Sequence, residues 1–273
     1  MTATYHFSSE QLIRSCPLPK SMFSHKSQHS LTITASKVEP LSALLKRNKK
    51  HLEYNVMEKL IETIGRQLHQ LELDNKGIAG FNLDDITVFY DMIPKRKVGS
   101  GSAVTNKAHT NDDTDDDDDN YDDDDNDNTY SMTDASIIHF AITNEDKIHD
   151  IDEEHQLTIT APYQKEYTTI AAATTKNIAF HSPEFKEFTS KKTLPYTLHF
   201  KSGYYSFGLL CVYCYISRSA AVAAAISKKD QDQDQDQDQD HEAILSSIVN
   251  TKIYWFLKRV LEENPSERRY ICV

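Results

Sequence analysis

Two adjacent carboxylates, Asp84 and Asp85, are the side chains whose type and spacing come nearest to a catalytic or metal-binding pair. Paired carboxylates can hold a divalent cation or accept a proton from a substrate hydroxyl group. No third ligand and no phosphate-binding motif accompanies them, and aspartate also enters strands through turns in which it bonds its own backbone. The sequence favours the turn, and both residues stay weak candidates for a site.

Four cysteines offer a second kind of chemistry. Cys211 and Cys214 have the spacing of a metal or redox motif, but no second pair and no histidine cluster stands near them. They lie in an apolar run, where cysteine packs as a small hydrophobic residue. The 12 histidines show none of the spacings of zinc motifs. The sequence therefore predicts no metal, no cofactor and no disulfide framework, which is typical of an intracellular, reducing compartment such as the cytoplasm.

Two acidic segments hold more negative charge than the net charge of the chain, which is −12. Residues 112–128 include 12 aspartates and residues 230–240 include 6, so the rest of the chain carries a net charge of +6. Segments with such dense charge cannot bury enough apolar surface to offset the loss of chain entropy on folding. The sequence therefore predicts disordered inserts at 95–132 and 228–241. Solvated surface is the simpler interpretation of these inserts, and capture of a basic protein is the alternative.

Hydrophobic periodicity predicts the elements that must position any site. The clearest is an amphipathic helix over Tyr54 to Leu73. Strands are predicted at 31–34, 86–90, 137–142 and 157–159, and helices at 38–45, from Tyr204 and at 242–262. The helix from Tyr204 is apolar on all sides, but its uninterrupted run is shorter than the roughly 20 residues that a bilayer span needs. Residues 1–30 are expected to be irregular, without a secretory leader.

Three short motifs follow one another in the second half of the chain. They are His181-Ser182-Pro183-Glu184, Ser202-Gly203-Tyr204-Tyr205-Ser206-Phe207-Gly208, and Asn264-Pro265-Ser266-Glu267-Arg268. In this order they resemble the C-lobe of a protein kinase, and more narrowly the degenerate kinase-like proteins of large DNA viruses. The resemblance implies that Glu184 and Arg268 form a buried ion pair. It also implies that Pro183, Ser206 and Gly208 are scaffold residues.

The same resemblance implies that the groups for phosphoryl transfer are missing. Gly80-Phe81-Asn82 stands where a kinase has His-Arg-Asp, so the carboxylate that accepts the substrate proton is replaced. The chain has no Asp-Phe-Gly and no glycine-rich loop, and the residues before Val38 are too few for a five-stranded N-lobe. Gly203 replaces the aspartate that opens the central helix in kinases.

The expected fold class is therefore α+β and mainly helical, with a kinase-like C-lobe over residues 31–273 and a truncated or absent N-lobe. The expected function is a catalytically inactive binding or scaffold module with a protein partner, for which a basic protein is one class. No direct nucleic-acid, membrane or small-molecule binding is expected. Two alternatives stay open: an acidic-tract protein that binds basic partners, and a divergent active kinase that uses Asp84 and Asp85.

Overall fold

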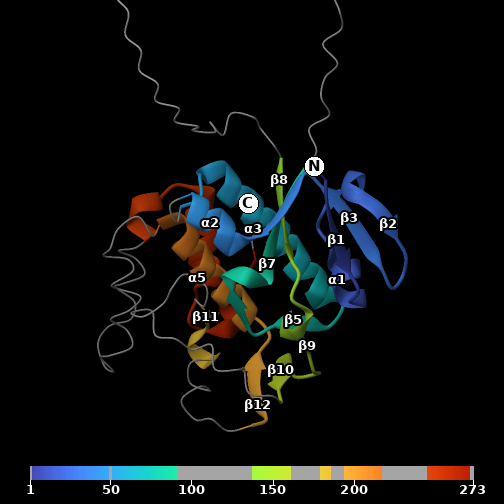
Figure 1. Ribbon diagram of the computed structural model, residues 1–273. Coiled ribbons are helices and arrows are strands. Elements are labelled where there is room, and N and C mark those ends of the chain that lie inside the picture. Colours follow the sequence, from blue (N-terminus) through green and yellow to red (C-terminus); the bar gives the residue numbers. More distant parts are fainter. Residues whose placement is uncertain are drawn as a thin grey trace, which may run out of the picture.

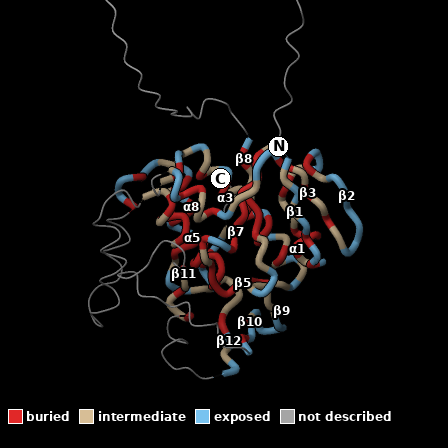
Figure 2. Tube along the Cα trace, viewed as in Figure 1, coloured by how far each residue is buried: buried red, intermediate tan, exposed pale blue. Residues whose placement is uncertain are grey.

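Figure 1 shows the fold in a computed structural model, which describes residues 2–48, 51–91, 137–160, 179–185, 194–216 and 245–270. The two predicted inserts, 95–132 and 228–241, lie outside the described residues. The remaining elements share one large hydrophobic core, with a smaller cluster beside it. Figure 2 shows buried residues gathered where α3, α5 and β7 meet.

The first thirty residues, for which the sequence predicts irregular structure, form regular elements. β1 (Ala3–Phe7), β2 (Phe23–Lys26) and β3 (Leu31–Ala35) make an antiparallel sheet in the order β1-β3-β2. α1 (Glu10–Ser15) and the 3-10 turn η1 (Lys20–Met22) connect β1 to β2. Along β3, buried apolar residues alternate with half-buried threonines, the two-residue period of a strand with one face on a core.

A second antiparallel sheet has the order β4-β7-β8 and lies near the middle of the molecule in Figure 1. Its strands are β4 (Lys37–Pro40), β7 (Ile86–Tyr90) and β8 (Ile138–Ile142). All five residues of β7 are buried, which explains why that strand is a continuous run of β-branched and aromatic residues. α2 (Leu41–Arg47) begins directly after Pro40, whose fixed φ suits a helix start.

The long helix α3 (Tyr54–Leu73) packs against β8 and has the bounds that the sequence predicts. Its buried face includes Gln67, whose side chain is fully enclosed. The backbone N–H of Ile142 donates to Gln67 Oε1 at 2.7 Å, and Gln67 Nε2 donates to the carbonyl of Ile142 at 3.1 Å. The amide thus pairs the backbone at the outer edge of β8 as a neighbouring strand would.

Short strands pair segments that are distant in sequence. The pairs are β5 (Lys76–Ile78) with β9 (Ile148–Asp150), β6 (Gly80–Asn82) with β11 (Ala179–His181), and β10 (Gln156–Ile159) with β12 (Tyr196–His199). Two 3-10 turns, η2 (Leu83–Asp85) and η3 (Glu145–Lys147), lead into β7 and β9. The pairing of β6 with β11 therefore places residues 80–82 beside the segment at 179–181.

Helix α5 (Ser202–Ile216) is buried on nearly all sides, as the sequence predicts for the helix from Tyr204. The predicted helix at 242–262 differs from the structure: its described part holds the 3-10 turn η5 (Ser246–Ile248) and then α8 (Lys252–Val260). Asn250 has a φ of 72°, which ends the first turn, and the Thr251 side chain caps α8. A further turn, η6 (Pro265–Glu267), precedes Arg268.

The expectation of a mainly helical fold is wrong. The molecule is mixed α/β, with several small antiparallel sheets. Strands of three to five residues do not produce a long hydrophobic period, so they are inconspicuous in a sequence beside a helix of 20 residues. Among the described helices, none combines the length and the apolar character that crossing a membrane requires.

Candidate functional site

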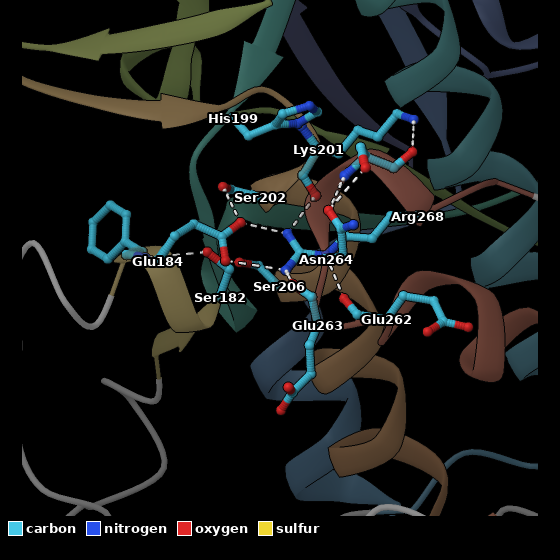
Figure 3. A network of polar contacts seen from close by, with 12 residues as sticks. Ser182, Glu184, His199, Lys201, Ser202, Ser206, Glu262, Glu263, Asn264 and Arg268 are labelled. Atoms are coloured by element: carbon cyan, nitrogen blue, oxygen red, sulfur yellow. Dashed lines mark hydrogen bonds and ion pairs between the residues drawn. The ribbon is translucent and has the colours of Figure 1, made fainter. Parts of the chain in front are cut away.

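The side chain of Arg268 is the largest fully buried side chain in the described residues. It follows η6 and lies at the centre of the polar network in Figure 3. The ring of Tyr205 covers the guanidinium group, with its centroid 4.8 Å from Cζ. A buried guanidinium keeps its charge, so its surroundings must supply acceptors for all its donors.

Every N–H group of Arg268 has such an acceptor, as Figure 3 shows for most of them. Nε donates to the carbonyl of Glu262 at 2.7 Å. Nη2 donates to Glu184 Oε2 at 3.1 Å and to the carbonyl of Glu263 at 2.8 Å. Nη1 donates to Glu184 Oε1 and, at 3.5 Å, to the carbonyl of Lys201. The five donors are therefore used inside the protein, and the pairing with Glu184 is bidentate.

Glu184 lies in a helical turn over 183–185 that begins at Pro183. Its Oε1 also accepts the hydroxyl of Ser202 at 2.7 Å, and its carbonyl accepts the hydroxyl of Tyr196 at 3.2 Å. Burial alone would raise the pKa of the Glu184 carboxyl, but the hydrogen bonds and charge of Arg268 hold it below its ordinary value. The ion pair that the kinase resemblance implies is thus present.

This network joins three segments of the chain: the turn at 182–185, the start of α5, and the segment from Glu262 to Arg268. Because its donors and acceptors satisfy one another, the arrangement can hold these segments in place. It offers no guanidinium donor to a substrate. Its chemistry is therefore that of a structural clamp.

Small residues let α5 approach its neighbours closely. Ser206 is fully buried, and its hydroxyl donates to the carbonyl of Ala79 at 3.4 Å. A Cβ atom added at Gly208 would lie 2.7 Å from Cγ2 of Val260 on α8. Both residues thus lie where α5 packs closely against its neighbours, Ser206 at the carbonyl of Ala79 and Gly208 at α8.

Gly203 makes the closest of these approaches. A Cβ atom there would lie 2.3 Å from the carbonyl oxygen of Ile78, the last residue of β5. Real Cβ atoms do not come so near a backbone oxygen, so any larger residue must displace the backbone. Glycine at position 203 is therefore required by the packing of this chain.

The structure gives the two candidate carboxylates different surroundings. Asp85 is 3% exposed, whereas Asp84 is exposed and accepts the hydroxyl of Ser42 from α2. Asp85 Oδ2 accepts the backbone N–H of Asn82 at 2.7 Å, and Oδ1 accepts Nδ2 of Asn144 at 2.7 Å. Burial raises the pKa of Asp85, against the lowering effect of both hydrogen bonds. These contacts favour the turn that the sequence predicts.

Asp85→Ala is expected to lower the free energy of unfolding by about 1–3 kcal/mol, because it leaves the Asn82 N–H and the Asn144 amide without their acceptor. Asp84→Ala, one residue away and exposed, should change it by less than about 0.5 kcal/mol. Urea unfolding followed by circular dichroism measures both. Equal losses would contradict the turn, and a Mg²⁺-dependent rise in melting temperature that Asp85→Ala abolishes would restore a cation site.

The cysteines show the packing that the sequence favours. Cys211 and Cys214 are fully buried on α5, and burial raises the pKa of both thiols, with the neighbouring Cys214 adding to the effect at Cys211. Burial also raises the pKa of Cys16 to about 11. Within the described ranges, no group of three or more histidine, cysteine, aspartate or glutamate side chains could hold a metal ion. Thiols in such surroundings are poor nucleophiles.

Several partners in these networks escape sequence reasoning. Asn144 meets Asp85 across 59 residues of chain, and no short-range signal encodes that contact. Asn144 is also the N-cap residue of η3, where its side chain accepts the N–H of Asp146 at 3.2 Å. This capping position is the one local signal that points to Asn144. Ser202 and Tyr205 lie inside the second motif, and that position is the sequence signal that marks them.

No protein-family model matches this chain, and no curated protein matches its sequence. The kinase resemblance therefore depends on the three motifs and on the residues that they contain. The features that bear on function are the Arg268 network and the turn at 80–85.

Proposed function

We propose that this chain is a kinase-like binding or scaffold module that does not transfer phosphate. Its main support is the network in which Glu184 and Arg268, the ends of two motifs 84 residues apart, pair bidentately. In the kinase resemblance this pair is structural and takes no part in phosphoryl transfer. A chain that keeps this clamp while its catalytic groups are replaced is suited to presenting surfaces to a protein partner.

The turn at 80–85 gives the second support. The resemblance puts Asn82 where a kinase has its catalytic aspartate, and an amide cannot accept the proton of a substrate hydroxyl group. Asn82 is the N-cap residue of η2, and its backbone N–H donates to Asp85. Asp85 is engaged on both oxygens and has a raised pKa, which weakens it as a ligand for Mg²⁺. The groups at this position thus serve the turn.

ATP with Mg²⁺ is expected to leave the melting temperature of the full chain unchanged. A ligand at about 100 times its dissociation constant stabilises the native state by about 2.7 kcal/mol, which would raise the melting temperature by several degrees. A dye-based melting curve with and without millimolar ATP therefore detects binding. The proposal would be wrong if ATP raised the melting temperature, if Asp85→Ala abolished that rise, and if the chain transferred phosphate to a protein substrate. The chain would then be a divergent kinase.

A further inference from the structure

The outer face of α8 carries an exposed tryptophan surrounded by cations. Trp255, the single tryptophan of the chain, is 52% exposed. Lys252, Lys258 and Arg259 are exposed as well, and they stand three residues before and three and four residues after it. Residues at these spacings are neighbours on one face of a helix. The opposite face of α8, with Ile253, Phe256, Leu257 and Val260, is buried in the core.

The charges on this outer face, defined by Lys252, Trp255, Lys258 and Arg259, are poorly balanced within the fold. In the part of the chain that the structure describes, no carboxylate pairs with Lys258 or Arg259. Lys258 lies over the ring of Tyr254, with 5.9 Å between Nζ and the centroid. Lys252 has a carboxylate, that of Glu58, only at 3.7 Å. Such a distance is too long for a strong hydrogen bond.

Tryptophan and arginine are the side chains most enriched among the residues that dominate protein interfaces. Covering a solvent-exposed indole with an apolar group is favourable because it removes apolar surface from water, and the three surrounding cations attract carboxylates. The chemistry that fits the outer face of α8 is therefore an acidic segment that also contains an apolar or aromatic side chain.

We infer that the outer face of α8 binds an acidic segment of a partner protein, with an apolar side chain on Trp255 and carboxylates on the cations. This inference rests on the proposed binding function and gives it a surface and a partner class. The acidic repeat of the chain itself, 230–240, contains only aspartate and glutamine. It can supply the charge but has no apolar side chain for the indole. The other acidic segment, 112–128, contains one aromatic residue, Tyr121, and no aliphatic one. Binding of that segment within the chain is therefore an outcome that the test has to separate from binding of a partner.

The fluorescence of Trp255 tests the inference directly, because no other tryptophan contributes to the emission. The probe is a short synthetic peptide rich in aspartate and glutamate with one phenylalanine and one leucine. Titrated into the full chain at low salt, it should shift the emission to shorter wavelength and protect the indole from acrylamide. Raising the salt should weaken the binding, because exposed charges are screened within roughly 8–10 Å at ordinary ionic strength.

Lys258→Glu with Arg259→Glu should weaken binding of the peptide roughly tenfold or more, since it turns attraction into repulsion. The matched control is Lys20→Glu with Lys26→Glu, which changes the net charge equally at exposed positions before and within β2. The control should leave the binding constant unchanged. Equal weakening by both double variants would show a response to net charge alone and overturn the inference.

Three other results would also overturn it. If a peptide that lacks the phenylalanine and leucine binds equally well, Trp255 does not contribute to binding. An equal emission shift with vesicles that contain phosphatidylserine, and none with the peptide, would make the face a membrane contact. A shift on replacing the aspartates of 112–128 or of 230–240 by asparagine, with no peptide added, would mean that the chain covers the face itself. Phosphate transfer, by contrast, would refute the proposed function without changing this titration.

Discussion

Replacing Glu184 by alanine is expected to lower the free energy of unfolding by about 3–5 kcal/mol, the cost of leaving one charge of a buried pair without its partner. The guanidinium of Arg268 has 0% exposure and the Glu184 side chain only 20%, so water is a poor replacement for the missing carboxylate. Two of its five donors would lose their best acceptors, and the hydroxyl of Ser202 would lose its acceptor as well. Chemical denaturation followed by circular dichroism measures the loss.

The matched control is Glu62→Ala, which removes the carboxylate of the pair between Glu62 and Arg66 on the surface of α3. Both side chains of that pair are largely exposed, at 42% and 64%, so its loss should cost less than about 1 kcal/mol. If the two substitutions cost the same, the Arg268 network does not clamp the fold. Glu184→Gln should lie between them, because the amide keeps one acceptor and loses the charge.

The same pair predicts how stability depends on pH. Because the folded pKa of Glu184 lies below its ordinary value of 4.5, the pair stabilises fully above the pKa of the unfolded carboxyl. That contribution is lost as the pH falls through the folded pKa. Asp85 acts with the opposite sign, since its raised pKa favours the protonated folded state and its effect is lost as the pH rises. Comparing wild type with Glu184→Gln between pH 3 and pH 5, about the range of model carboxyl pKa values, isolates the first effect.

The elements that the sequence predicts best are those with a strong local pattern. α3 has a repeated apolar stripe over 20 residues, and β7 is an unbroken run of strand-forming residues; both have the predicted bounds. α5 begins within two residues of its predicted start because an all-apolar helix is conspicuous. In each case the local signal and the burial in the fold agree.

The elements that sequence reasoning misses depend on remote partners. β1 and β3 pair across more than twenty residues, and β6 meets β11 across nearly a hundred, so neither has a hairpin signal. The break before α8 did have a local signal. Asn250 takes the positive φ that asparagine tolerates, and Thr251 is a favoured N-cap residue.

The site divides in the same way. The pairing of Glu184 with Arg268 follows from a motif resemblance, but the carbonyl acceptors of Arg268 could not, because backbone groups have no sequence signature. The different burial of Asp84 and Asp85 was likewise hidden. One of the two partners of Asp85 is Asn144, which a long segment of chain separates from it.

Gly203→Asp, which introduces the residue that kinases have at the start of the central helix, is expected to cost at least about 4 kcal/mol in this chain. Its Cβ would lie 2.3 Å from the carbonyl oxygen of Ile78, and its carboxylate would be buried beside a backbone acceptor that repels it. Gly203 itself is buried, so the new side chain cannot turn into solvent without moving α5.

Gly203→Ala separates the steric cost from the electrostatic one. Alanine favours a helix over glycine by about 1 kcal/mol, yet the contact with a backbone atom should make the net change destabilising by about 1–3 kcal/mol. The matched control is Gly77→Ala, where a Cβ would meet the flexible end of Leu157 at 2.9 Å, so a smaller loss is expected. Equal melting temperatures for Gly203→Ala and wild type would mean that α5 can retreat from β5. In that case the glycine is not a requirement of packing, and an aspartate could be accommodated there as it is in kinases.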